Sequence, residues 1–366
     1  MKQDIIVISG VNMVEGGIFT ILDNCLQKIS GYSEKKGIKV IALVNDKSEF
    51  NYPNIEYIEF PKAKKFWFLR LYYEYFYFKK LSNTIKPDVW LSLHDVSPNV
   101  VCKKRFVYCH HPTIFYKSTV KDWKFDYKIG VFSLLYKYLY QINIKKNDAV
   151  FVQQNWIKKE FESLFNIQKV IVCKPEYVEK ITSEKIALEE DKVHFLYPSF
   201  PRTFKNFEII FEAIQLLDTS IRNKARFHFT TIKNNPNKFA THLYQKYNNL
   251  EEVVFWDKID RKELLKLYNS IDCLLFPSKL ETWGLPITEA KGFGKPVLLA
   301  NLPYAKETIG NYDKVSFFDI DNPQELANLI NKFVNKTIQY QGNKYTFDKN
   351  DQLNDWNSIF DFMLKN

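Results

Sequence analysis

The sequence predicts an α/β protein built from two doubly wound domains, each with a parallel sheet covered by helices. Short apolar runs rich in β-branched residues alternate with helical patterns along the whole chain, which is typical of buried parallel strands and their crossover helices. The length of 366 residues favours two domains, because a domain usually holds about 150 residues. Hydrophobic residues make up 46% of the chain and charged residues 26%, a composition that excludes a disordered or collagen-like protein.

Near-continuous apolar runs mark the expected strands. In the first half of the chain they are Asp4–Ser9, Lys39–Val44, Val89–Leu93, Phe106–Cys109 and Ala149–Val152. In the second half they are Val193–Pro198, Ala225–Thr231, Val253–Trp256, Cys273–Pro277 and Pro296–Ala300. Because such sheets bind ligands at the carboxyl ends of their strands, we expect functional residues directly after these segments.

Helical patterns fall between the strands, at Phe19–Ser30, Leu69–Ile85, Trp156–Leu164, Asn206–Leu217, Ala240–Tyr247, Arg261–Ser270, Pro286–Phe293 and Pro323–Val334. A charged and weakly periodic stretch, Glu176–Asp191, separates the two series. We therefore expect a Rossmann-like N-terminal domain, a linker, a Rossmann-like C-terminal domain and a final segment, over residues 1–174, 175–192, 193–344 and 345–366.

Charge and cysteine content narrow the function further. Lys and Arg outnumber Asp and Glu by 52 to 42, a net charge of +10, which favours anionic partners such as phosphates or an anionic membrane surface. The cysteines are odd in number, five, with no CxxC pair, which argues against a disulfide framework or structural zinc site and suits a reducing cytoplasm. We expect neither a signal peptide nor a transmembrane helix, since no uncharged apolar window reaches about 18 residues.

The most informative motif is the stretch Phe276–Ala290, which follows an apolar strand and opens a helix. Glu281 lies in the loop, Glu289 lies about one turn inside the helix, and Gly284 lets the backbone turn between them. A helix that starts at such a loop offers backbone N–H groups and the positive end of its dipole, which together suit a diphosphate. Carboxylates beside the diphosphate can accept hydrogen bonds from sugar hydroxyls.

This stretch, which reads PSxxETWGLPxxEA and is followed by Gly294–Val297, resembles the EX7E signature of the family 4 glycosyltransferases. The resemblance implies a GT-B fold, in which two Rossmann-like domains face each other across a cleft and the last helix crosses back onto the first domain. It also implies a retaining enzyme that uses a nucleotide sugar, with Glu281 on the donor sugar and Glu289 on the ribose. The donor-binding loop would include Thr282, Trp283, Gly284 and Leu285.

A second motif, Tyr197–Asn206, follows the first strand of the expected C-terminal domain. It resembles the family's basic loop, in which Arg and Lys neutralise the leaving diphosphate through charge-assisted hydrogen bonds. Lys205 matches the family's Lys. The Arg position stays open, because many members carry it where this chain has Ser199, whereas this chain offers Arg202.

Two signals in the expected N-terminal domain also follow strands. Gly16 and Gly17 resemble the family's glycine loop, which brings backbone amides close to the donor. His110 and His111 follow the strand Phe106–Cys109, and the resemblance implies a His near the transferred sugar or the acceptor hydroxyl. His110 aligns better, and the choice between the two histidines stays open.

Two further patterns have competing explanations. Asp319–Asp321 superficially matches a DxD metal motif, but Asp321 or Asn322 is better explained as the cap of a helix that begins at Pro323, so we expect no metal. The stretch Pro61–Leu81 interleaves aromatic residues with the cations Lys62, Lys64, Lys65, Arg70, Lys79 and Lys80. Such a mixture suits a membrane surface or a helix whose aromatics enter the core, and less well single-stranded nucleic acid.

We therefore expect a cytoplasmic glycosyltransferase that uses a GDP- or UDP-linked sugar, with no further cofactor, no metal and no nucleic-acid partner. We expect its acceptor to be a lipid-linked saccharide of bacterial surface polysaccharide synthesis, and the protein to contact the anionic inner leaflet. The expected catalytic residues are Glu281, Lys205, Arg202 and His110. Two alternatives stay open: another GT-B enzyme, such as a sugar-nucleotide epimerase or phosphorylase, and a non-enzymatic basic module that binds membranes or nucleic acid.

Overall fold

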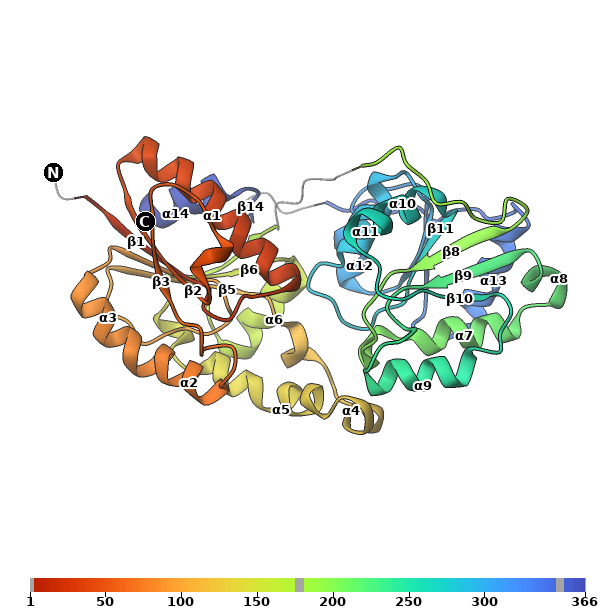
Figure 1. Cartoon of the computed structure of the whole chain (residues 1–366), viewed down its shortest axis with the longest axis horizontal. Coiled ribbons are helices and arrows are strands. Elements are labelled where there is room, and N and C mark those ends of the chain that lie inside the picture. Colours follow the sequence, from red (N-terminus) through yellow and green to blue (C-terminus); the bar gives the residue numbers. More distant parts are fainter. Residues whose placement is uncertain (1–2, 175–180, 347–351, 366) are drawn as a thin grey trace. The chain divides into compact units, whose positions relative to one another are not determined.

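The computed structural model describes residues 3–174, 181–346 and 352–365. Part of the expected linker (175–180) and part of the expected final segment (347–351 and 366) therefore lie outside the described residues. The chain divides into two compact units, each with its own parallel sheet (Figure 1), which confirms the two-domain α/β prediction. The first unit comprises Met1–Phe115, Leu134–Tyr177 and Asp348–Asn366, and the second comprises Tyr116–Ser133 and Val178–Phe347.

The sheet of the first unit is doubly wound around its first strand. Its order is β14-β7-β6-β5-β4-β1-β2-β3, with parallel pairing throughout. The chain direction across the sheet reverses between β1 and β4, a topological switch point where such sheets bind ligands. The strands are β1 Ile5–Ser9, β2 Lys39–Val44, β3 Ile55–Glu59, β4 Val89–Ser92, β5 Lys104–Cys109, β6 Ala149–Val152, β7 Val170–Cys173 and β14 Gln352–Leu353.

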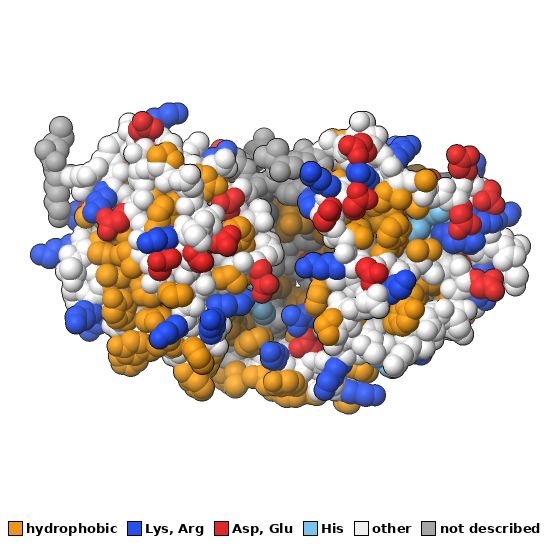
Figure 2. Space-filling model, viewed as in Figure 1, with side chains coloured by type: hydrophobic (Ala, Val, Ile, Leu, Met, Phe, Trp, Pro, Cys, Tyr) orange, Lys and Arg blue, Asp and Glu red, His pale blue; other side chains and the backbone are white. Residues whose placement is uncertain are grey.

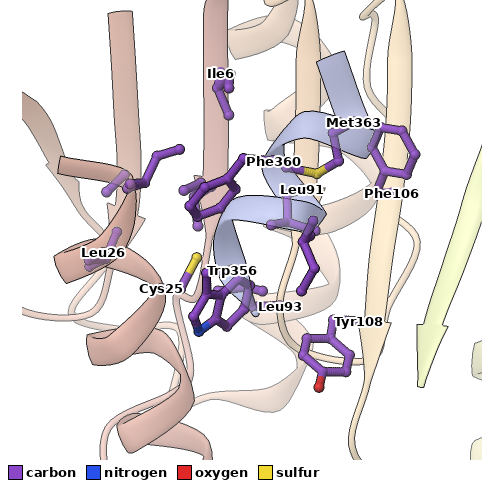
Figure 3. Packing of buried hydrophobic residues seen from close by; sticks show 14 of the residues in the cluster. Ile6, Cys25, Leu26, Leu91, Leu93, Phe106, Tyr108, Trp356, Phe360 and Met363 are labelled. Atoms are coloured by element: carbon purple, nitrogen blue, oxygen red, sulfur yellow. The ribbon is translucent and has the colours of Figure 1, made fainter. Parts of the chain in front are cut away.

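Helices cover both faces of this sheet (Figure 1). On one face α1 (Gly16–Lys36) packs against α14 (Trp356–Lys365), and Trp356, Phe360 and Met363 join the buried side chains of β1, β4 and β5 (Figure 3). The last helix therefore belongs to the core of the first unit. The other helical segments of this unit are η1 Lys47–Glu49, α2 Trp67–Tyr72, η2 Tyr73–Tyr77, α3 Phe78–Ile85, η3 Pro112–Phe115, η4 Ile144–Lys146 and α6 Asn155–Phe165.

The expected helix Leu69–Ile85 is interrupted in the structure by the π-helical turn η2. Two backbone carbonyls of this turn bond outside the helix: Glu74 accepts from the Asn99 N–H at 2.8 Å, and Tyr75 accepts from the Asn99 side chain at 3.3 Å. The predicted helix is therefore present over its whole length, but its middle turn is π-helical, since these long-range bonds compete with the regular α-helical ladder.

The sheet of the second unit has the order β10-β9-β8-β11-β12-β13 and is also parallel. Its strands are β8 Val193–Tyr197, β9 Ala225–Phe229, β10 Val253–Phe255, β11 Cys273–Phe276, β12 Val297–Ala300 and β13 Val315–Phe318. Its helical segments are η5 Thr203–Lys205, α7 Phe207–Leu216, α8 Thr219–Arg222, α9 Lys238–Tyr247, α10 Arg261–Ser270, α11 Leu285–Gly292, α12 Pro303–Ile309 and α13 Pro323–Val334. The switch point of this sheet lies between β8 and β11.

Residues 116–133 belong to the second unit although they lie within the first half of the chain. They include α4 (Val120–Phe125) and the start of α5 (Tyr127–Gln141). Aromatic contacts contribute to this association, since the Phe125 ring lies 5.5 Å from that of Phe239. Within the described residues, every helix is too short or too polar to cross a lipid bilayer.

Candidate functional site

The two loops that carry the main sequence motifs lie side by side in the second unit. One follows β8 and the other follows β11, the adjacent strands that flank the switch point. The loops are joined directly, because the Lys279 N–H donates to the Phe204 carbonyl at 2.8 Å. The sequence therefore brings the basic loop and the carboxylate loop together where a doubly wound sheet presents its ligand.

Lys205 and Glu281 form an ion pair between these loops. Their side chains are 17% and 13% exposed, so the pair is largely removed from water. The Tyr197 hydroxyl donates to the Lys205 carbonyl at 2.6 Å, which holds the end of the short turn η5 against the sheet. Lys205 is thus a preplaced cation that an anionic ligand could share with Glu281.

Arg202 and Ser199, the two positions left open for the family's Arg, differ in their surroundings. The Arg202 guanidinium is partly exposed and pairs with Asp126, whereas Ser199 is buried. Arg202 is therefore the cation available beside Lys205 in this loop. Asp126 is a partner that the sequence reasoning missed, because 75 intervening residues separate it from Arg202.

Gly284 is the N-cap of the helix α11 (Leu285–Gly292), in a conformation that favours glycine, with a φ of 83°. Glu289 lies in that helix and is 5% exposed, and its Oε1 is 2.6 Å from Arg261 at the start of α10. A carboxylate has the acceptor oxygens that sugar hydroxyls require as hydrogen-bond partners. Arg261 is a second residue that sequence reasoning missed.

Of the other residues predicted in the carboxylate loop, Thr282, Trp283 and Leu285 are partly exposed and Gly284 is buried. The Trp283 indole N–H donates to the Thr288 hydroxyl at 3.0 Å. The backbone carbonyl of Trp283 accepts from the Thr308 hydroxyl. Thr282 and Leu285 flank this anchored position, and Leu285 is the first residue of α11. The loop is thus held at Trp283, while Thr282 and Leu285 remain partly exposed.

The DxD-like triplet behaves as the start of a helix. Asn322 is the cap, and its side chain accepts from the Glu325 N–H at 3.2 Å. Asp319 accepts from the Asp321 N–H at 2.9 Å, and Asp321 pairs with Lys279 at 2.7 Å. Asp319 is thus bonded within the turn, whereas Asp321 pairs with a lysine of the loop after β11.

In the first unit the glycine pair lies inside a helix and not in the loop that the sequence predicts before it. Gly16 is the first residue of α1 and has a φ of 69°, and both Gly16 and Gly17 are exposed. A Cβ atom at either position would meet nothing within 4 Å. The helix begins earlier than expected because Gly16 can adopt the left-handed conformation that Ala or Val would resist.

His110 and His111 follow β5 as expected and are held by a single carboxylate. Asp95 Oδ1 accepts from the His110 N–H at 2.6 Å, the His111 N–H at 3.1 Å and the Tyr140 hydroxyl at 2.8 Å. The His110 ring contacts the Gln153 amide at 3.0 Å and is buried, which lowers the pKa of this imidazole. His110 therefore favours the neutral state, as a general base or hydrogen-bonding group requires.

The neighbouring His94 lies at the switch point of the same sheet. It contacts the Ser9 hydroxyl at the end of β1 at 3.0 Å, Glu74 at 3.3 Å and the Arg70 guanidinium at 3.0 Å. Arg70 is buried, so among the cations of the stretch Pro61–Leu81 it belongs to the interior and not to a basic surface. Burial and the nearby guanidinium lower the pKa of His94 well below its usual value, which keeps this imidazole neutral.

Comparisons with known proteins match part of this chain to a family. Residues 178–345 match the family model described as glycosyl transferases group 1. An uncharacterized 41.2 kDa protein in the cps region of Klebsiella pneumoniae is 23% identical over 220 residues, which cover 57% of this chain and 56% of that protein. The O-antigen biosynthesis glycosyltransferase WclY of Escherichia coli is 35% identical over 81 residues, 22% of each protein. The chain thus spans about half the length of the first relative, and less of the second.

Solved structures share the fold over nearly the whole chain. Sucrose-phosphate synthase from Thermosynechococcus elongatus has a TM-score of 0.67 at 15% identity, covering 92% of this chain and 90% of that chain. HepE of Anabaena in complex with UDP-glucose has a TM-score of 0.60 at 15% identity, covering 91% and 90%. At these identities the likeness concerns the fold. Residues 178–345 therefore match the model of the group 1 glycosyl transferases, and the fold of the chain is that of the GT-B glycosyltransferases.

Proposed function

We propose that this protein transfers a sugar from a GDP- or UDP-linked donor to a saccharide acceptor, with retention of configuration. The observation that carries the proposal is the junction of the two loops at the switch point between β8 and β11. This junction pairs Lys205 with Glu281 and lies just before the helix that holds Glu289. A preplaced cation, a helix N-terminus and two carboxylates are the groups that a sugar diphosphate needs.

In this mechanism the donor diphosphate gains negative charge as its bond to the sugar breaks. Lys205, Arg202 and the N–H groups at the start of α11 stabilise that charge, which is commonly the largest contribution to catalysis. Glu281 accepts hydrogen bonds from the sugar hydroxyls, and Glu289 accepts them from the ribose. His110 is the group of the first unit that we assign to the donor sugar or the acceptor hydroxyl. Retention rests on the family resemblance.

Relatives and neighbours support the choice of substrates. HepE binds UDP-glucose, and the relatives include an O-antigen biosynthesis glycosyltransferase and a protein of a cps region. We therefore assign this protein to surface polysaccharide synthesis at the cytoplasmic face of the membrane. Because cations and helix amides already neutralise the diphosphate, we propose that transfer needs no metal ion.

Donor binding is tested by thermal unfolding of the full chain with UDP, GDP, ADP and CMP, and with their sugar conjugates. A ligand at 100 times its dissociation constant stabilises by about 2.7 kcal/mol, which is readily measured. We expect Glu289→Gln to weaken binding of the bare diphosphate and Glu281→Gln to weaken only the sugar conjugate, with the exposed Glu251→Gln as control. Equal defects of both site variants toward the bare diphosphate would contradict this division of roles, and no stabilisation by any nucleotide would contradict the function.

We also propose that the first unit contacts an anionic membrane, because its aromatic stretch is exposed and not confined to the core. Hydrophobic side chains and cations gather over α2 and α3 (Figure 2). Phe68 is 81% exposed and Phe76 is 69% exposed, and all the cations of the stretch except Arg70 are exposed. The neighbouring helix α5 adds the exposed residues Leu134, Leu135, Tyr138 and, just after it, Ile142. Such a surface suits a bilayer that presents a lipid-linked acceptor.

Vesicle binding tests this surface. We expect binding to anionic vesicles that weakens with salt, since each surface cation near the leaflet contributes about 1 kcal/mol. The triple variant Lys62→Glu, Lys64→Glu and Lys65→Glu should lose it while donor binding persists. Substituting Glu for three exposed lysines of the second unit changes the net charge equally and serves as control: Lys224, Lys332 and Lys336. Equal losses for both triple variants would contradict a local docking surface.

A further inference from the structure

The segment Tyr116–Asp126 reaches the basic loop from a distant part of the sequence. Within the second unit, Asp122 lies at its centre and is fully buried. The carboxylate accepts from the Thr119 N–H at 2.6 Å, the Thr119 hydroxyl at 2.8 Å and the Tyr116 hydroxyl at 3.1 Å. It also accepts from the hydroxyl of Thr203, and Thr203 is the first residue of η5. One carboxylate thus ties α4 to the turn that ends at Lys205.

Asp126, one helical turn further along, contacts the same loop in a different way. It forms an ion pair with Arg202. The Asp126 side chain is 12% exposed and that of Arg202 is 41% exposed. Because the Arg202 side chain already reaches solvent, it can leave the ion pair without a change in the core. The segment is further held by Lys121, whose Nζ lies 2.9 Å from Glu208 in α7.

We propose that the segment Tyr116–Asp126 is part of the donor site, with Asp122 and Asp126 acting in opposite directions. This inference rests on the proposed function, because it takes the leaving diphosphate as the ligand of the basic loop. Asp122 is a positioning residue: its bond to Thr203 fixes the turn that presents Lys205. Asp126 is a counter-ion that competes with the diphosphate for Arg202.

The opposite signs follow from the charges. An Asn at position 126 keeps the size of the side chain but removes its charge, so Arg202 no longer has to exchange one anion for another. Removing the bond between Asp122 and Thr203 instead leaves the turn less ordered before the ligand arrives, and the ligand must then supply the ordering free energy. Both effects act through the phosphates, since the nucleoside has no group that these two side chains are proposed to serve.

The test is titration calorimetry on the full chain with UDP and GDP and with uridine and guanosine. We expect Asp126→Asn to tighten diphosphate binding by about fivefold, the scale of a partly exposed ion pair. We expect Asp122→Ala to weaken it by about tenfold, the scale of a hydrogen bond to a charged group. Thr203→Val removes the same bond while leaving Asp122 its other partners, so it should weaken diphosphate binding even if Asp122→Ala does not fold. Nucleoside affinity should stay unchanged in all folded variants.

Several results would overturn this inference. Asp126→Asn with unchanged or weaker diphosphate binding would show that Asp126 does not compete for Arg202. Equal losses of nucleoside and diphosphate affinity in Thr203→Val would show that the variant disturbs the whole binding site, and that the bond between Asp122 and Thr203 does not specifically position Lys205. The exposed Asp313 supplies the charge control, and an Asp313→Asn variant that tightens binding as much as Asp126→Asn would reduce the effect to net charge. Wild-type protein that binds neither diphosphate would instead refute the proposed function itself.

Discussion

Replacing Lys205 with Met separates the structural role of this cation from its role toward the donor. The Lys205–Glu281 pair is more than four-fifths buried on both sides, so the variant leaves a carboxylate in the protein without its counter-ion. Breaking a fully buried ion pair lowers the free energy of unfolding by about 3 to 5 kcal/mol. Because this pair is partly exposed, we expect a loss of about 2 to 3 kcal/mol. For a domain of this size that corresponds to a fall in melting temperature of about 5 to 10 °C.

The double variant Lys205→Met with Glu281→Gln is the matched control. A neutral amide needs no counter-ion, so we expect most of the lost thermal stability to return. Turnover should stay at least about a hundredfold below wild type in both variants, because the cation that stabilises the leaving diphosphate is absent. The assays are thermal unfolding and initial rates with the nucleotide sugar that stabilises the wild type most. Recovery of turnover together with stability would refute a direct role of Lys205, and an unchanged melting temperature in the single variant would refute the buried pair.

Two further predictions concern pH and metal ions. Burial raises the pKa of the Glu74 carboxyl from its ordinary value to about 8. The contribution of this carboxyl to stability is therefore present at acid pH and is lost as pH rises through about 8. The melting temperature of the wild type should therefore fall more between about pH 6 and about pH 9 than that of Glu74→Gln, and parallel pH profiles would contradict the assignment. Transfer activity should survive EDTA, and a loss that Mg²⁺ or Mn²⁺ restores would show that the cations and helix amides do not suffice.

Several elements were predicted from the sequence with their observed limits. The helices Arg261–Ser270 and Pro323–Val334 begin and end where expected, because Asp260 and Asn322 cap them. The strand Ala149–Val152 also matches, since it is a short apolar run buried on both faces. In contrast, the helix α5 was not predicted, because its exposed face carries large hydrophobic residues and therefore lacks the usual polar stripe.

The same contrast holds for the candidate site. Lys205, Glu281 and Glu289 stand directly after strands or in the helix that follows, so the alternation of elements is enough to bring their loops to one edge of a sheet. Asp95, which holds the loop of the two histidines, has a φ of 73°. The local sequence does not predict this left-handed backbone conformation for an aspartate. The partners of the basic loop in the segment Tyr116–Asp126 depend on how a distant part of the chain packs, which strand and helix patterns do not encode.

We propose that this chain moves a sugar from a nucleotide to an acceptor. This proposal is tested most directly by incubating the protein with its stabilising nucleotide sugar and a lipid-linked saccharide acceptor, and following both products by NMR. We expect one nucleoside diphosphate for each glycoside formed, with the anomeric configuration of the donor retained. Consumption of the nucleotide sugar at the same rate without acceptor, or no glycoside with any acceptor while the donor binds, would contradict it.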